Sequence, residues 1–163
     1  LSEKIHYSHS GSLQELLIAP SDIVVSDFPI GYYPVNERAK NYQTAFPEGN
    51  SFAHFLMFEQ NVNYLKESGW GIFIVPSDIF ETDKSSVLMG WLKENVHIQA
   101  FLSLPVDLFH KNGMKKSIII VQKIGEKSLQ AEQVLLGEIP DLKNAQKMQS
   151  FLDIFHNWSA KMI

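Results

Sequence analysis

The chain has 163 residues, of which 45% are hydrophobic and 20% are charged, and its formal net charge is -4. These fractions are typical of a folded globular domain and exclude a disordered polyelectrolyte. The sequence contains no cysteine, which excludes disulfides, thiolate zinc sites and cysteine nucleophiles. No apolar run approaches the roughly 20 residues that cross a bilayer, and no signal peptide is evident, so we expect a cytoplasmic protein.

Short, continuously apolar runs alternate with amphipathic stretches along the chain. Such runs predict strands that are covered on both faces, as in the parallel sheet of an α/β protein with right-handed crossovers. We expect strands at residues 23–26, 71–75, 98–102 and 117–122. We expect helices at 51–66 with Ser51 as N-cap, after Thr82 or Asp83, and at 144–159, whose apolar stripe is either core or an oligomer contact.

Residues 31–50 form a long connection that is rich in tyrosine, proline, asparagine and glycine. Connections of this length without regular structure are uncommon unless they are functional or disordered. This one follows the carboxyl end of a predicted strand, where open α/β sheets bind their ligands. We therefore expect a binding loop or a lid.

The most informative motif is Asp27-Phe28-Pro29-Ile30, which follows the first predicted strand and precedes Gly31. The strand delivers a carboxylate to its tip, and proline and glycine then favour a fixed, non-helical turn. An exocyclic amine is a poor nucleophile because its lone pair is delocalised into the ring. A carboxylate oxygen of Asp27 and the carbonyl of Phe28, held by Pro29, are suited to accept its two hydrogens and so orient it for methyl transfer.

This motif has a simpler interpretation, because an aspartate before a proline turn is often only a turn former. The aromatic rings are equally open to two interpretations. Phe28, Tyr32 and Tyr33 are each suited to stack on a base, and equally to pack in the core or in a lid.

Further motifs follow in a characteristic order, and together with the Asp27 motif they resemble the catalytic half of adenine-specific DNA methyltransferases. They lie at residues 49–55, 64–66, 69–76, 91–95, 104–109 and 116–123. The similarity includes modification subunits of type I restriction systems and is strongest to a stand-alone family of Gram-positive bacteria. It extends over about residues 5–155.

This resemblance implies a Rossmann-like class I methyltransferase fold with strand order 3-2-1-4-5-7-6 and S-adenosylmethionine as cofactor. The four predicted strands would be strands four to seven, and residues 5–8 a remnant of strand three. Residues 1–163 would form a single partial domain without the N-terminal cofactor-binding half. Asp27, Phe28 and Pro29 would act on the acceptor, and Ile30, Gly31, Tyr32 and Tyr33 would line its site.

The sequence departs from the family pattern at three places. Ile30 replaces the aromatic residue that stacks on the flipped base, and Phe28 replaces the first of two prolines. Gly11 stands where an acidic residue contacts the cofactor's adenine. No glycine-rich turn precedes Asp27, so the residues that bind the cofactor are unknown.

Two main functions follow from these features. One is S-adenosylmethionine-dependent methylation of adenine in DNA, and the alternative is an inactive methyltransferase-like protein that binds nucleic acid or serves as a scaffold. A dinucleotide-dependent oxidoreductase is disfavoured because its glycine fingerprint is absent from the sequence. No metal site is expected from the spacing of His6, His9, His54 and Glu59.

DNA is the expected partner, and no membrane partner is expected. Residues 110–116 are the one basic cluster and favour a solvated loop over a DNA contact. The strand at 23–26 would be an edge, so we expect a second copy of the chain, the N-terminal segment or the missing half to cover it.

Overall fold

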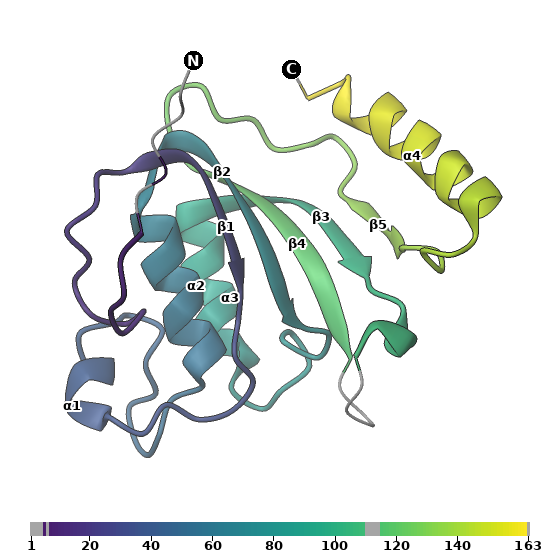
Figure 1. Ribbon diagram of the computed structural model, residues 1–163. Helices are drawn as coiled ribbons and strands as arrows, with labels where there is room; N and C mark the ends of the chain where they lie inside the picture. Colours follow the sequence, from purple (N-terminus) through teal and green to yellow (C-terminus); the bar gives the residue numbers. More distant parts are fainter. Residues whose placement is uncertain (1–4, 6, 110–114, 163) are drawn as a thin grey trace.

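The computed structural model describes residues 5, 7–109 and 115–162 (Figure 1). The strands of this part form one five-stranded sheet in the order β1-β2-β4-β3-β5. They are β1 (Ser21–Asp27), β2 (Leu65–Pro76), β3 (Val96–Ser103), β4 (Lys116–Lys123) and β5 (Leu135–Glu138). The helices are α1 (Asn36–Ala39), α2 (Ala53–Asn63), α3 (Ser85–Asn95), the 3-10 helix η1 (Val106–Leu108) and α4 (Ala145–Ser159).

The sheet is mixed, whereas the apolar runs predicted a parallel one. β1 pairs parallel to β2, and β3 parallel to β5, but β4 runs antiparallel to both β2 and β3. A parallel pairing of β3 with β4 would need a crossover, usually a helix, and the described part of their connection holds only η1. The predicted adjacency of the four strands, in the order four, five, seven, six, is confirmed.

One predicted strand is not observed at the described residues, and one observed strand was not predicted. The described residues of the range 5–8 form no strand, and Ile5 and Tyr7 are exposed. In addition, β5 extends the sheet beyond β3. This strand was missed because its sequence, Leu-Leu-Gly-Glu, is short and has no β-branched residue.

The helix ends show where local signals are reliable. α4 begins beside Asn144, whose side chain accepts a hydrogen bond from the Lys147 amide at 3.0 Å. Ser51 is not the N-cap of α2, because its hydroxyl instead accepts from the Phe46 amide at 2.8 Å. The N-cap of α3 is Lys84, without a side-chain cap, and neither Thr82 nor Asp83 takes that place.

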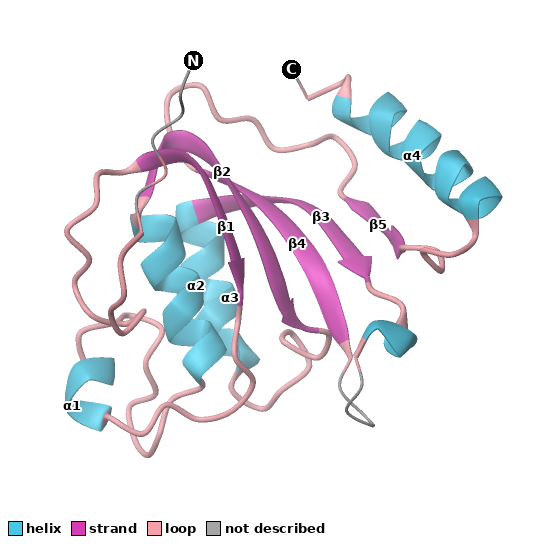
Figure 2. Cartoon of the chain, in the orientation of Figure 1, coloured by secondary structure: helices cyan, strands magenta, loops and turns pink. Residues whose placement is uncertain are grey.

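The two faces of the sheet are covered unequally. α2 and α3 lie together behind one face, and α4 lies beyond β5 at the far side (Figures 1 and 2). The main core lies under α2 and α3, and a smaller core joins α4 to β3 and β4. Much of the apolar stripe of α4 joins this core, since Phe151, Phe155 and Trp158 are partly buried against Ala100, Leu102 and Ile120. Leu152 of the same stripe is exposed.

β1 has a largely exposed face. Ile23 and Val25 are 59% and 70% exposed, so the prediction that both faces of this strand are covered is wrong for the described chain. Among the described residues β1 pairs only with β2, so the described part of the N-terminal segment adds no strand at its edge.

Candidate active site

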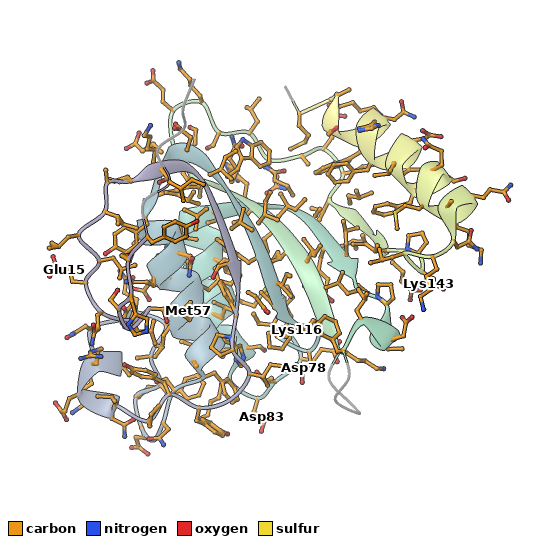
Figure 3. The ribbon with its side chains drawn as sticks, in the orientation of Figure 1. Glu15, Met57, Asp78, Asp83, Lys116 and Lys143 are labelled. Carbon is orange, nitrogen blue, oxygen red and sulfur yellow. The ribbon has the colours of Figure 1, made fainter. Side chains whose placement is uncertain are left out.

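Three strands meet at one edge of the sheet. β1 and β2 run parallel and both end there, at Asp27 and Pro76. β4 begins at the same edge, because its first residue, Lys116, is the antiparallel partner of Pro76. Figure 3 labels Lys116 and Asp78 near the lower end of these strands. The edge therefore combines carboxylates from strand ends with an amine from a strand start.

Phe28 fixes the backbone just beyond β1. Its ring is fully buried, with centroids 5.0 Å from Phe73 and 5.6 Å from Phe58. Its amide donates to the Ile74 carbonyl at 2.9 Å, which extends the pairing with β2 by one residue. Of the two interpretations of this ring, core packing is correct, so Phe28 offers the site its carbonyl and not its ring.

Lys116 connects the two groups that the motif had suggested as acceptors for an amine. Its Nζ donates a hydrogen bond to Asp27 Oδ1, and a second one to the Phe28 carbonyl at 3.3 Å. The side chain of Lys116 is only 9% exposed, whereas that of Asp27 is 59% exposed. The prediction of a solvated basic loop is therefore wrong for Lys116, and residues 110–114 lie outside the described residues.

The long loop after the motif is tied back at its ends. Tyr33 N donates to the Ser51 carbonyl at 2.8 Å, and Ala53 N donates to the Gly31 carbonyl at 2.9 Å. Gly31 has a φ of +127°, a conformation that side chains disfavour. These bonds hold residues 30–33 against the start of α2.

Glu59 anchors the middle of the same loop. This buried carboxylate on α2 accepts from the amides of Gln43 at 3.1 Å and Thr44 at 2.8 Å. The Thr44 hydroxyl in turn donates to the Phe55 carbonyl at 3.1 Å. The predicted binding loop is thus a structured connection that rests on α2.

The aromatic residues of the loop differ in their access to solvent. Tyr32 is 64% exposed, and its ring stacks on Phe52 at 4.9 Å between centroids. Tyr33 is half-buried, and its hydroxyl accepts from Arg38 Nη1 at 3.3 Å. Of the three aromatic candidates, Tyr32 is therefore the one whose ring is largely exposed to solvent. Tyr32 also lines a hollow of about 560 Å³ together with Phe46, Glu48, Gly49, Asn50 and Lys84.

The remaining motif residues lie at the surface. Pro29 and Ile30 are exposed, so neither side chain contributes to the core. Ile30 leaves the tip without the aromatic ring that the family pattern places there.

His54 lies on α2, on the packed side of the motif. From the sequence it was considered only as a metal ligand. It is buried in α2, where its ring stacks on Phe52 at 5.0 Å. Burial lowers its pKa to about 4, although the charge of Asp78 and the backbone of Pro29 act in the opposite direction. Its Nδ1 has no hydrogen-bond partner among the described residues. A neutral imidazole therefore packs beneath the turn.

Comparison with known proteins identifies the family. Residues 2–158 match the N-6 DNA Methylase family, which is nearly the whole sequence. The chain belongs to this family. An uncharacterised Bacillus subtilis protein, YtxK, is 37% identical over 161 residues, which is 99% of this chain and 49% of YtxK.

Solved structures place the fold. A Listeria monocytogenes protein, provisionally assigned as a class I S-adenosylmethionine-dependent methyltransferase, is 38% identical with a TM-score of 0.83, over 90% of this chain and 45% of its own. The methyltransferase subunit of a Streptococcus thermophilus type I restriction-modification system has a TM-score of 0.60 at 12% identity, over 91% of this chain and 35% of its own. The chain therefore has a class I methyltransferase-type α/β fold and spans about half the length of the relatives it matches.

The described residues fit the acceptor side of such a site. Asp27 and the Phe28 carbonyl are hydrogen-bond acceptors at the carboxyl edge of the sheet, as an amine requires. Gly11, expected at an acidic cofactor contact, lies in an exposed segment before β1, and no glycine-rich turn precedes β1 in the part that the structure describes. We assign none of the described residues to the cofactor.

Proposed function

We propose that this chain provides the acceptor site of an S-adenosylmethionine-dependent methyltransferase that acts on an amine, with adenine in DNA as the substrate. One observation supports this proposal above the others. A carboxylate oxygen of Asp27 and the carbonyl of Phe28 converge on a single amine nitrogen, that of Lys116. The same two oxygens have the arrangement needed to accept both hydrogens of an exocyclic amine.

The chemistry assigned to these residues is orientation and hydrogen bonding. Two acceptors on one amino group draw its hydrogens out of the plane of the ring, which returns the lone pair to the nitrogen. Bound S-adenosylmethionine would supply the methyl group. Pro29 restricts the backbone that carries the Phe28 carbonyl, and Gly31 permits the turn that follows.

We place the adenine base against Tyr32, in the loop that follows the motif. Exposed Tyr32, already stacked on Phe52, offers a ring face for a base taken out of its stack. Ile30 and Tyr33 would border the same space.

DNA as partner rests on the family to which the chain belongs. Residues 1–163 would then form part of a methyltransferase domain of a cytoplasmic protein. No helix in the described part is long and apolar enough to cross a membrane.

The test uses the complete gene product and a variant of the proposed acceptor contact. Asp27→Ala should lower methyl transfer from labelled S-adenosylmethionine to adenine in DNA by at least about 100-fold, because an orienting contact made at the reacting nitrogen is lost. Cofactor affinity, measured by calorimetry, should stay within about threefold of the parent value.

The matched control is Asp22→Ala on the same strand. Asp22 is an exposed carboxylate that pairs with Lys66 at 2.9 Å, away from the tip. Its loss should leave methyl transfer unchanged. Near-normal methylation by Asp27→Ala would remove Asp27 from the acceptor site.

A second function is favoured by the same contact. Because Lys116 already fills both acceptors, the site also fits a protein that kept the fold and serves as a scaffold or a nucleic-acid-binding module. That function predicts DNA binding without methyl transfer by the unmodified protein and by every variant at Lys116.

A further inference from the structure

Lys116 makes the contacts that the proposed function assigns to the substrate. Its Nζ reaches Asp27 Oδ1 and the Phe28 carbonyl, and its side chain is nearly buried. An ordinary surface ion pair needs neither this burial nor the second contact to a backbone carbonyl. The ammonium therefore occupies the position of an amine between two acceptors.

The surroundings of Lys116 allow this contact to be exchanged. Asp27 keeps more than half of its side chain exposed, so its carboxylate remains solvated when the ammonium leaves. Lysine carries its charge on a flexible four-carbon stem, which permits such a movement. The Phe109 ring, whose centroid lies 5.9 Å from Nζ, offers the ammonium an additional contact.

We propose that Lys116 is an internal competitor for the acceptor amine: its ammonium holds the acceptor site closed, and a substrate amine binds by displacing it. The proposal rests on the proposed function, in that it takes Asp27 and the Phe28 carbonyl as the acceptor pair. An ammonium nitrogen has no free lone pair, so Lys116 holds the place of the methyl acceptor without being one.

The competition also selects the class of substrate. A ligand that displaces Lys116 must return a hydrogen-bond donor to the Phe28 carbonyl, because this contact is buried and an unpaired buried acceptor is costly. A second donor on the same nitrogen can then bind the solvated Asp27 carboxylate. A group with two N–H donors on one nitrogen meets this requirement. A ring position without an amine does not.

The experiment measures binding, in the complete gene product, of two nucleosides that differ only in the amine. Adenosine carries the exocyclic amine, and purine riboside lacks it. Lys116→Ala should bind adenosine at least about tenfold more tightly than the parent protein in calorimetry, because a charged hydrogen bond no longer competes. Purine riboside should gain less than about threefold.

Lys115→Ala is the matched control. Lys115 is the exposed neighbour of Lys116, so its substitution removes the same charge from the same segment. Adenosine affinity should then stay at the parent value. Equal adenosine affinity of the parent and Lys116→Ala proteins overturns the competition, and so does weaker binding by Lys116→Ala.

A separate probe distinguishes failure of this inference from failure of the proposed function. Methylammonium reproduces the lysine head group, so it should shift the amide signals of Asp27 and Phe28 in Lys116→Ala and not in the parent protein. If methylammonium does so while adenosine binds neither protein, the amine site stands and adenine is not its substrate. If neither probe binds Lys116→Ala, the amine site itself is refuted.

Two further observations complete the test. If the alanine variant does not fold, Lys116→Met keeps most of the side-chain volume and repeats the adenosine comparison. Mass spectrometry of the parent protein after incubation with S-adenosylmethionine should find Lys116 unmethylated. A methylated Lys116 would make it an acceptor and would overturn its role as a competitor.

Discussion

The two faces of the sheet differ in how well their side chains are buried. Under α2 and α3, Phe28, Phe58 and Phe73 form a closely packed aromatic group that is inaccessible to solvent. On the opposite face of β1, Ile23 and Val25 remain largely exposed. The acceptor motif follows this same strand, yet its support comes almost entirely from the packed face.

This difference explains how the tip of β1 keeps its geometry. Phe28 has two functions: its buried ring fixes the backbone, and its carbonyl faces Lys116 at the edge. His54 and Glu59 on α2 support the turn and the loop from the same side. The described contacts of the Phe28 ring therefore lie on the packed face of β1.

The largest expected effect is the loss of the Phe28 ring. Phe28→Ala should lower the free energy of unfolding by about 3–5 kcal/mol, because it leaves a cavity among Phe58, Phe73 and their neighbours. Chemical denaturation followed by fluorescence measures this change. Phe28→Leu, which retains most of the apolar volume, is the control and should cost less than half as much. A loss below about 1 kcal/mol for alanine would show that the packed face does not hold the tip.

An intermediate effect is expected from the pH dependence of His54. Its pKa is 6.5 in the unfolded chain and about 4 in the folded protein. Between these values the unfolded state binds a proton that the folded state does not, so stability falls as the pH is lowered from 6.5 to about 4. The total contribution is at most about 3 kcal/mol and is fully present above pH 6.5.

Denaturation curves between pH 4 and 8 test this prediction. His54→Leu should flatten the dependence of the unfolding free energy on pH across that window, whatever its effect on absolute stability. His156→Gln, at an exposed position of α4, should leave the slope unchanged. An unchanged slope in His54→Leu would show that another group causes the acid sensitivity.

The sequence predicted the positions and order of the first four strands, partly from local patterns and partly from the family resemblance. Apolar runs located the first four strands, and their order followed from the family resemblance. The motif correctly placed Asp27 at the tip of a strand, because strand ends and proline turns have strong local signals, and the role of Asp27 and the Phe28 carbonyl as acceptors for a substrate amine stays a prediction. The exposure of β1 was not predictable, since an apolar run does not say which of its faces the same chain covers.

Lys116 could not be found in this way. It lies 89 residues from Asp27 in the sequence, within a basic stretch whose local pattern indicates a solvated loop. Only the antiparallel pairing of β4 with β2, which places Lys116 opposite Pro76, brings the ammonium to the acceptor pair. The family strand order placed this strand beside β2, but it gave no register and so did not bring Lys116 to Asp27.

The smallest expected effect compares two adjacent valines of β1. Val24 packs against the main core, whereas Val25 is 70% exposed on the other face. Val24→Ala should cost about 1–2 kcal/mol of unfolding free energy, because it removes partly buried methyl groups. Val25→Ala should cost about 0.5 kcal/mol, mainly through the lower strand propensity of alanine. Chemical denaturation of the 163-residue chain at low protein concentration would measure both unfolding free energies. Equal costs would mean that another surface covers Val25 in solution, and their growth with protein concentration would identify that surface as a second copy of the chain.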